Sequence, residues 1–236
     1  STIRKRIEDT SWALTESVHD GARYPEKEIR LSVSDTDASI RNGRISARLT
    51  DIPTQVGYLQ FYKEDQLLLS EYDYVVHAHN PGTRTYKQLN GLPDGDELSQ
   101  SEVSFSPQEN ERFFGLGLNA TGSVNLKGSI IDLYQRHVKH VIPFVVSSSG
   151  YGLLWNNPSL GRVELGINRT RWVSEGCKQI DYYITTGNGY AEIMSHYADV
   201  TGHPPPLPYW ASGFWQCKLR YSNQSQIMDV AREYVR

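Results

Sequence analysis

The sequence predicts a mostly β protein, an antiparallel β-sandwich followed by the first strand and helix of an α/β domain. Short apolar runs separated by Gly, Asn, Asp and Pro recur from Glu28 to about Thr186, as is typical of a sandwich. The apolar period then becomes that of a helix near Tyr190. A proline-rich link beginning at His203 leads to one further strand-like run and a second helix.

Composition limits the classes of function. The chain has 236 residues, of which 38% are hydrophobic and 22% charged, as in an ordinary folded domain. The net charge is −3 with both signs interspersed, which argues against nucleic acid or an anionic membrane as a partner. No apolar run approaches the length of a membrane-spanning helix.

The first half predicts antiparallel sheet. Apolar residues alternate at Ile29, Leu31 and Val33, and again at Ile45, Ala47 and Leu49. The strand-like runs are "EIRLSVSD", "GRISARLTD", "QVGYLQFYKED", "QLLLSEY", "TRTYKQLNG" and "SEVSFS".

A second strand-rich stretch follows. It contains "SIIDLYQ", "VIPFVVSSSGYGLLWNNP", "GRVELG", "TRWVSEG" and "QIDYYITTG". Glycine supplies the positive φ that tight turns require, so "SSSGYG" predicts a hairpin connection.

Two helices are expected after the strands. Asn188 is the predicted cap of the first, and Gly202 ends it. Its apolar face consists of Tyr190, Ile193, Met194 and Tyr197. The second helix begins at Asn223, where Gln226 completes a capping box.

The run "WASGFWQC" between these helices is the expected strand. We therefore predict a sandwich domain over residues 1–202, and a linker with the start of an α/β domain over residues 203–236. One strand and one helix cannot close a parallel barrel, so we expect the remainder on a companion chain.

The stretch "GHPPPLPYWASGFWQCKLRY" resembles the entry to the catalytic barrel of glycoside hydrolase family 31, the α-glucosidases and α-xylosidases. Upstream matches keep the family's order: "ERFFGLG", "IDLYQRHVKHVIPFVVSSSGYGLLWNNP" and "QIDYYITTGNGYAEIMSHYADVTG". The resemblance implies a galactose-mutarotase-like β-sandwich before a (β/α)8 barrel, and it implies no cofactor or metal.

The resemblance also implies a retaining mechanism that uses two aspartates of later barrel strands, which this sequence does not contain. We therefore name no catalytic residue here. Asp132 in "IIDLYQ" is better explained as a surface or hydrogen-bonding carboxylate at a strand end.

Five residues are candidate contacts to the sugar. Barrel enzymes build their sites at the carboxyl ends of strands, which favours Trp215, Lys218 and Arg220, although half of a barrel strand faces the outer helices. In the family a sandwich loop reaches over the barrel mouth, and the matching loop "YQRHVKH" contains Arg136 and His137. The alternative is a solvated hairpin tip, and the His137 and His140 pair is better explained as ordinary surface histidine than as a metal site.

The resemblance implies an oligosaccharide substrate with terminal, non-reducing α-linked sugars, and the form "GFWQCKLRY" is similar to that of members that cleave α-xylosides, such as those of xyloglucan. Two alternatives remain: an α-glucosidase of the same family, and a sandwich that binds carbohydrate without catalysis.

Several features predict a secreted glycoprotein. Acceptor sequons occur at Asn119, Asn168 and Asn223, and we expect glycans on the first two because Asn223 is needed as a helix cap. Cys177 and Cys217 form a disulfide in an oxidising compartment or remain buried thiols.

Overall fold

The computed structural model describes residues 29–35, 37–50, 57–72, 83–90, 98–118 and 121–235. The chain divides into two compact units, Ser1–Gly202 and His203–Arg236. Within the described residues, no helix is long and apolar enough to cross a membrane.

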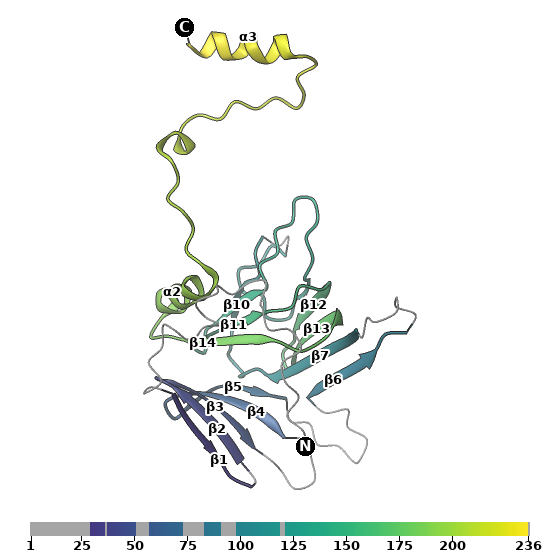
Figure 1. Cartoon of the computed structure of the whole chain (residues 1–236), viewed down its shortest axis with the longest axis vertical. Coiled ribbons are helices and arrows are strands. Elements are labelled where there is room, and N and C mark those ends of the chain that lie inside the picture. Colours follow the sequence, from purple (N-terminus) through teal and green to yellow (C-terminus); the bar gives the residue numbers. More distant parts are fainter. Residues whose placement is uncertain are drawn as a thin grey trace. The chain divides into compact units, whose positions relative to one another are not determined.

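The first unit is built from two antiparallel sheets (Figure 1). The larger one has ten described strands, in the order β1, β2, β3, β4, β5, β7, β13, β12 and β9, with β6 also paired to β7. These strands are β1 (Ile29–Val33), β2 (Asp37–Asn42), β3 (Ile45–Thr50), β4 (Tyr58–Lys63), β5 (Gln66–Glu71), β6 (Arg84–Gln88), β7 (Ser99–Ser106), β9 (Ile130–Asp132), β12 (Gly161–Leu165) and β13 (Thr170–Cys177). The smaller sheet has the order β14 (Tyr182–Thr186), β11 (Tyr151–Trp155), β10 (Phe144–Ser147) and β8 (Phe113–Gly115).

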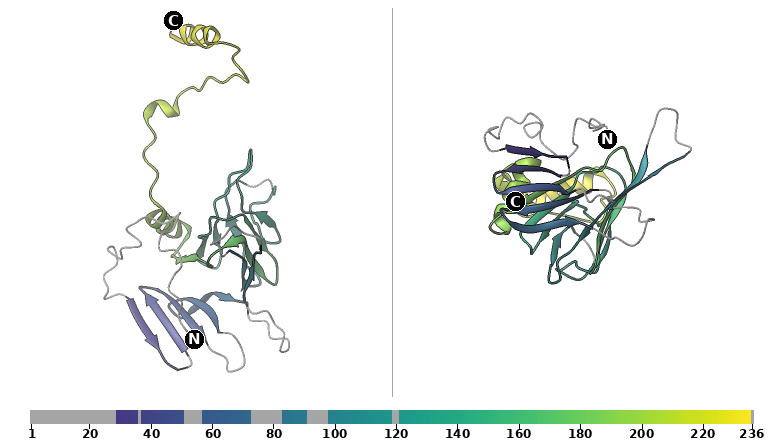
Figure 2. Two further views of the ribbon diagram at one scale, coloured as in Figure 1. Left: turned by 45° about the vertical axis from the view of Figure 1, so that its right-hand side comes forward. Right: turned by 90° about the horizontal axis from the view of Figure 1, so that it is seen from below.

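The main core lies between the two sheets. Side chains of both sheets share one buried cluster, in which the rings of Trp155 and Trp172 lie 5.9 Å apart. The other face of the small sheet packs against helix α2 (Tyr190–Thr201), seen beside β14 in Figure 2. There Phe144 stacks on Tyr197 with ring centres 4.2 Å apart. The first unit is therefore a β-sandwich with a helix on its smaller sheet, as the sequence predicts.

The large sheet forks along one edge of β7. The C-terminal end of β7 pairs with β5, where Phe105 lies opposite Glu71. The N-terminal part of β7 pairs with β6, where Val103 lies opposite Arg84. Figure 1 shows β5 and β6 following one another along this edge. Because β5 and β6 pair with different parts of the same edge of β7, the sheet divides where Glu71 of β5 and Arg84 of β6 lie beside each other.

Most predicted elements of this unit are confirmed, including the β10–β11 hairpin with Gly150 at φ 91°. The predicted Asn188 cap of α2 is wrong: the cap residue is Gly189, and no side chain caps the helix. The Asn188 carboxamide instead accepts a hydrogen bond from the Arg44 guanidinium at 3.0 Å. Gly202 ends α2 at φ 99°, as predicted.

The second unit contains a 3-10 turn, Tyr209–Ser212, and helix α3 (Gln224–Val235). The predicted strand "WASGFWQC" is wrong, since residues 213–223 form neither strand nor helix. A strand is stabilised by hydrogen bonds to a neighbouring strand, and the described residues of this unit provide none. The cap of α3 is as predicted: the Asn223 carboxamide accepts a hydrogen bond from the Gln226 amide at 3.0 Å.

Candidate functional site

The loop between β9 and β10 ends in a tight hairpin tip, which contains the predicted contacts Arg136 and His137. Arg136 and Lys139 form an antiparallel bridge, and the Lys139 amide donates to the Arg136 carbonyl at 3.1 Å. Val138 completes the turn at φ 60°, a conformation that a β-branched residue rarely adopts. His137 and Val138 are thereby presented at the end of the loop.

The tip has a cationic rim around one carboxylate. Asp132 lies 3.9 Å from the Arg136 guanidinium and 4.0 Å from the Lys139 ammonium. The Arg136 guanidinium also stacks over the ring of Tyr134, 4.2 Å from its centre. Asp132 is thus a half-exposed carboxylate in ion pairs, as predicted for a surface group at the end of a strand.

The tip borders a cavity of about 610 Å³. Besides the tip residues 136–139, Leu118, Thr121, Ile130 and Ile131 line it. His137 is exposed and makes no hydrogen bond or ion pair within the described part of the chain. Apolar walls beside the Arg136 guanidinium and the His137 imidazole suit a sugar, whose ring has apolar C–H faces and a rim of hydroxyl groups.

The other predicted contacts lie in the second unit. Trp215 is 66% exposed, and its indole N–H donates to the Ala211 carbonyl at 2.9 Å. Lys218 lies 5.8 Å from the centre of the Tyr221 ring, and Arg220 is exposed. Because these three residues belong to a separate unit, their grouping with Arg136 and His137 stays a prediction.

The family model of the glycosyl hydrolase 31 N-terminal galactose mutarotase-like domain matches residues 2–164. This chain belongs to glycoside hydrolase family 31. A family 31 glucosidase of Pseudescherichia vulneris, ORF2, itself uncharacterized, is 39% identical over 215 residues, which cover 84% of this chain and 39% of that protein. An α-xylosidase of Saccharolobus solfataricus is 39% identical over 154 residues, covering 61% of this chain and 21% of the relative.

A solved structure is similar over almost the whole chain. The crystal structure of a family 31 α-xylosidase from a soil metagenome, in complex with xylose, matches with a TM-score of 0.81 and 35% identity. The match covers 98% of this chain and 34% of that protein. This family 31 chain therefore spans less than half the length of the relatives it matches.

Sequence reasoning missed the residues that hold the tip in place. Gly117, at φ 80°, follows β8, and the next amide, of Leu118, donates to the His140 carbonyl at 2.8 Å. A Cβ atom at Gly117 would lie 2.0 Å from that carbonyl oxygen. The paired glycines in "FFGLG" were the available signal, because a close backbone approach at positive φ requires glycine.

The same motif anchors β8 to the β10–β11 hairpin. Glu111 is 3% exposed and accepts hydrogen bonds from the Gln108 amide at 2.8 Å and from the Ser147 hydroxyl. Burial, together with the nearby Glu111 carboxylate, raises the pKa of Tyr151 well above its ordinary value. In this chain the motif "ERFFGLG" therefore holds β8 against the β10–β11 hairpin.

The predicted modification sites have different surroundings. Cys177 and Cys217 are free thiols; the first is buried and donates to the Ser101 hydroxyl at 3.1 Å, and the second is exposed. Asn168 is exposed in the β12–β13 turn, whereas Asn119 lies outside the described residues. Glycosylation and secretion stay predictions.

Proposed function

We propose that this chain forms the N-terminal sandwich and the beginning of the catalytic domain of a retaining α-glycosidase. Its proposed reaction is the release of terminal α-linked xylose from xyloglucan-type oligosaccharides. The observation that carries the proposal is family 31 membership, combined with 39% and 35% identity to α-xylosidases. Xylosidase A of Aspergillus niger, 33% identical over 205 residues, also supports it.

Exposed apolar side chains of the second unit support a companion polypeptide. Trp210, Phe214 and Leu219 are 68%, 75% and 97% exposed. On α3, Ile227 and Tyr234 are 50% and 63% exposed. Large apolar surface of this kind marks an interface. In the proposal, the rest of a (β/α)8 barrel covers it.

In the proposal this chain contributes to sugar binding and the companion contributes catalysis. A retaining glycosidase uses two carboxyl groups about 5–5.5 Å apart, one as nucleophile and one as general acid. In the proposal both belong to the companion, while Arg136 and His137 donate hydrogen bonds to hydroxyl groups of the sugar. Xylose lacks the exocyclic CH2OH of glucose, so an obstruction where that group would lie selects xylosides.

Kinetics on the native enzyme test the activity. We expect kcat/KM for a chromogenic α-xyloside to exceed that for the matching α-glucoside by at least about tenfold. The reverse ratio would establish the α-glucosidase alternative, which the glucosidase name of the Pseudescherichia vulneris relative favours. Activity on neither would overturn the proposal.

Native and denaturing size analysis tests the companion. We expect active material larger than this 26.8 kDa chain, and a second, larger polypeptide on a denaturing gel. An active species of 26.8 kDa alone would refute this part of the proposal.

A further inference from the structure

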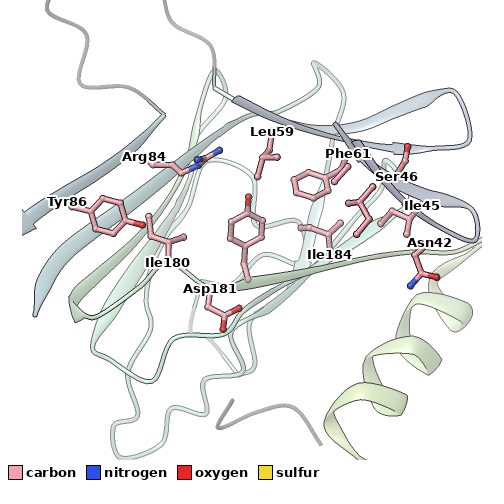
Figure 3. Close-up of a pocket in the computed structure, with 13 residues that line it drawn as sticks. Asn42, Ile45, Ser46, Leu59, Phe61, Arg84, Tyr86, Ile180, Asp181 and Ile184 are labelled. Carbon is pink, nitrogen blue, oxygen red and sulfur yellow. The ribbon is translucent and has the colours of Figure 1, made fainter. Parts of the chain in front are cut away.

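A cavity at the fork of the large sheet lies within the sandwich unit (Figure 3). Its volume is about 490 Å³, within the range of pockets that bind small molecules. It is lined by β2, β3 and β4 on one side, and by β6 and the segment entering β14 on the other.

The polar end of the cavity is built around a buried ion pair. Glu71 is fully buried and accepts two hydrogen bonds from the Arg84 guanidinium, at 2.7 and 2.6 Å. The Glu71 carboxylate also accepts from the Leu59 amide at 2.8 Å and from the Tyr182 hydroxyl at 3.3 Å. Burial raises the pKa of Tyr182, so its hydroxyl keeps the proton that it donates.

Arg84 is thereby held rigidly at the cavity wall. Burial, the largest single effect, lowers its pKa, but the hydrogen bonds to Glu71 and the negative charge of that carboxylate act together to raise it above its ordinary value. A guanidinium has more N–H donors than the two that Glu71 accepts. The side chain is 31% exposed, and Figure 3 shows the guanidinium pointing into the pocket.

A flat aromatic wall stands beside Arg84. Tyr86 is 57% exposed, and the backbone of Ile180 hydrogen-bonds its hydroxyl, which fixes the ring. Asp181 lines the same cavity, where its carboxylate accepts from the Asn156 carboxamide at 3.0 Å. Figure 3 shows Arg84 and Tyr86 on one side, and Asn42 and Ile45 on the opposite side.

The floor is an apolar row across the sheet. Ile40 pairs with Ala47, and Ala47 pairs with Phe61, so the three side chains share one face of β2, β3 and β4. All three line the cavity. The site thus combines an apolar surface, one exposed aromatic face and fixed polar groups of both signs.

We propose that this cavity binds a neutral pyranose saccharide, with one sugar face against Tyr86 and hydroxyl groups bound to Arg84. A small anion is disfavoured because Glu71 already neutralises Arg84. A purely apolar ligand would leave Arg84 desolvated without new hydrogen bonds. A sugar satisfies both the apolar and the polar surfaces.

Titration of the full chain with methyl α-D-xyloside, maltose and a xyloglucan heptasaccharide, followed by amide NMR, tests the proposal. At least one saccharide should shift the amide signals around Tyr86, Ile180 and Asp181. We expect Tyr86→Ala to weaken its binding by about tenfold. Ile40→Trp, which fills the cavity from the exposed side, should abolish the binding.

Tyr209→Ala is the matched control, because Tyr209 is 96% exposed in the second unit and should leave binding unchanged. Circular dichroism spectra and urea midpoints must show that the variants are folded. The proposal is overturned by saturable binding that both cavity variants retain, by shifts confined to Arg136–Lys139, or by the absence of binding to all three saccharides. This readout needs no hydrolysis, so it stands or fails independently of the proposed enzymatic activity.

Discussion

Tryptophan side chains are buried in the sandwich unit and exposed in the second unit. In the sandwich, Trp155 and Trp172 are 2% and 1% exposed and lie against each other in the core. In the second unit, Trp210 and Trp215 also lie near each other, at 5.8 Å between ring centres, but are 68% and 66% exposed. A pair of aromatic residues therefore makes a core only where further layers cover it.

This difference shows that the apolar side chains of the sandwich are buried within the unit, whereas those of the second unit are not. The two sheets of the sandwich bury each other's apolar faces, and α2 covers the remaining face of the small sheet. The described second unit has one helix and no sheet against which its apolar side chains can pack. The exposed apolar side chains of the second unit therefore predict an interface.

The largest expected effect is on the core tryptophan. Trp172→Ala should lower the free energy of unfolding of the chain by about 3–5 kcal/mol, whereas Trp215→Ala should change it by less than about 0.5 kcal/mol. Urea unfolding followed by far-ultraviolet circular dichroism measures both. Trp172→Phe gives an intermediate loss if the alanine variant does not fold. Equal losses at the two tryptophans would break the comparison.

A smaller effect is expected where β8 holds the hairpin tip. Gly117→Ala places a methyl group against the His140 carbonyl and should cost about 2 kcal/mol or more. Gly122→Ala is the control: it has φ 68° but nothing within 4 Å of the added methyl group, and should cost about 1 kcal/mol. Urea midpoints of both variants decide, and similar losses would show that the close approach is unimportant.

The pH dependence of unfolding should distinguish an ion pair of the sandwich unit, Arg171 with Glu102, from an exposed ion pair of the second unit. Hydrogen bonds from Arg171, which outweigh the effect of burial, lower the pKa of Glu102 below its ordinary value of 4.5. The stabilisation is therefore present above that value and is lost as the pH falls through the lower folded-state pKa. Arg171→Gln should reduce stability at neutral pH and flatten the decline below pH 4.5.

Arg232→Gln is the control for this prediction, because its ion pair with Asp229 is 67% and 65% exposed. Its unfolding curves should keep the pH dependence of the unmodified chain. A decline just as steep in Arg171→Gln would contradict the assigned role of Glu102.

The smallest effect concerns the two asparagines predicted as caps. Asn223→Ala should destabilise α3 by about 1 kcal/mol, because the side chain caps the helix. Asn188→Ala should leave the helicity of α2 unchanged, because Asn188 bonds Arg44 instead. Secondary chemical shifts of the first turn of each helix measure the difference. Fraying of α2 in Asn188→Ala would contradict this assignment.

The sequence predicted those elements whose stabilising contacts are local or strongly patterned. The β10–β11 hairpin and α3 follow from glycine, capping and apolar period. Strand β2, "DASIRN", was missed because its residues have low strand propensity, and pairing with β1 and β3 on both sides decides its structure. The wrong strand in "WASGFWQC" has the converse cause, since its pattern fits a strand whose neighbours the described unit lacks.

The site was predictable to a similar degree. The resemblance to family 31 indicated the loop that contains Arg136 and His137, and the structure presents both residues at its tip. Their contact with a sugar stays a prediction. The dependence of this tip on Gly117, and the fork that joins Glu71 to Arg84, depend on long-range pairing of strands. Such pairing leaves little trace in residue order, so these features became visible only in three dimensions.

Amide hydrogen exchange at residues 210–221 tests most directly the claim that the second unit completes its fold on a companion. The proposal predicts rapid exchange in this chain alone and strong protection in its complex with the proposed companion, as for a barrel strand. Core amides of β7 and β13 should be protected in both samples and serve as the reference. Strong protection of residues 210–221 in the isolated chain, or rapid exchange in both samples, would contradict it.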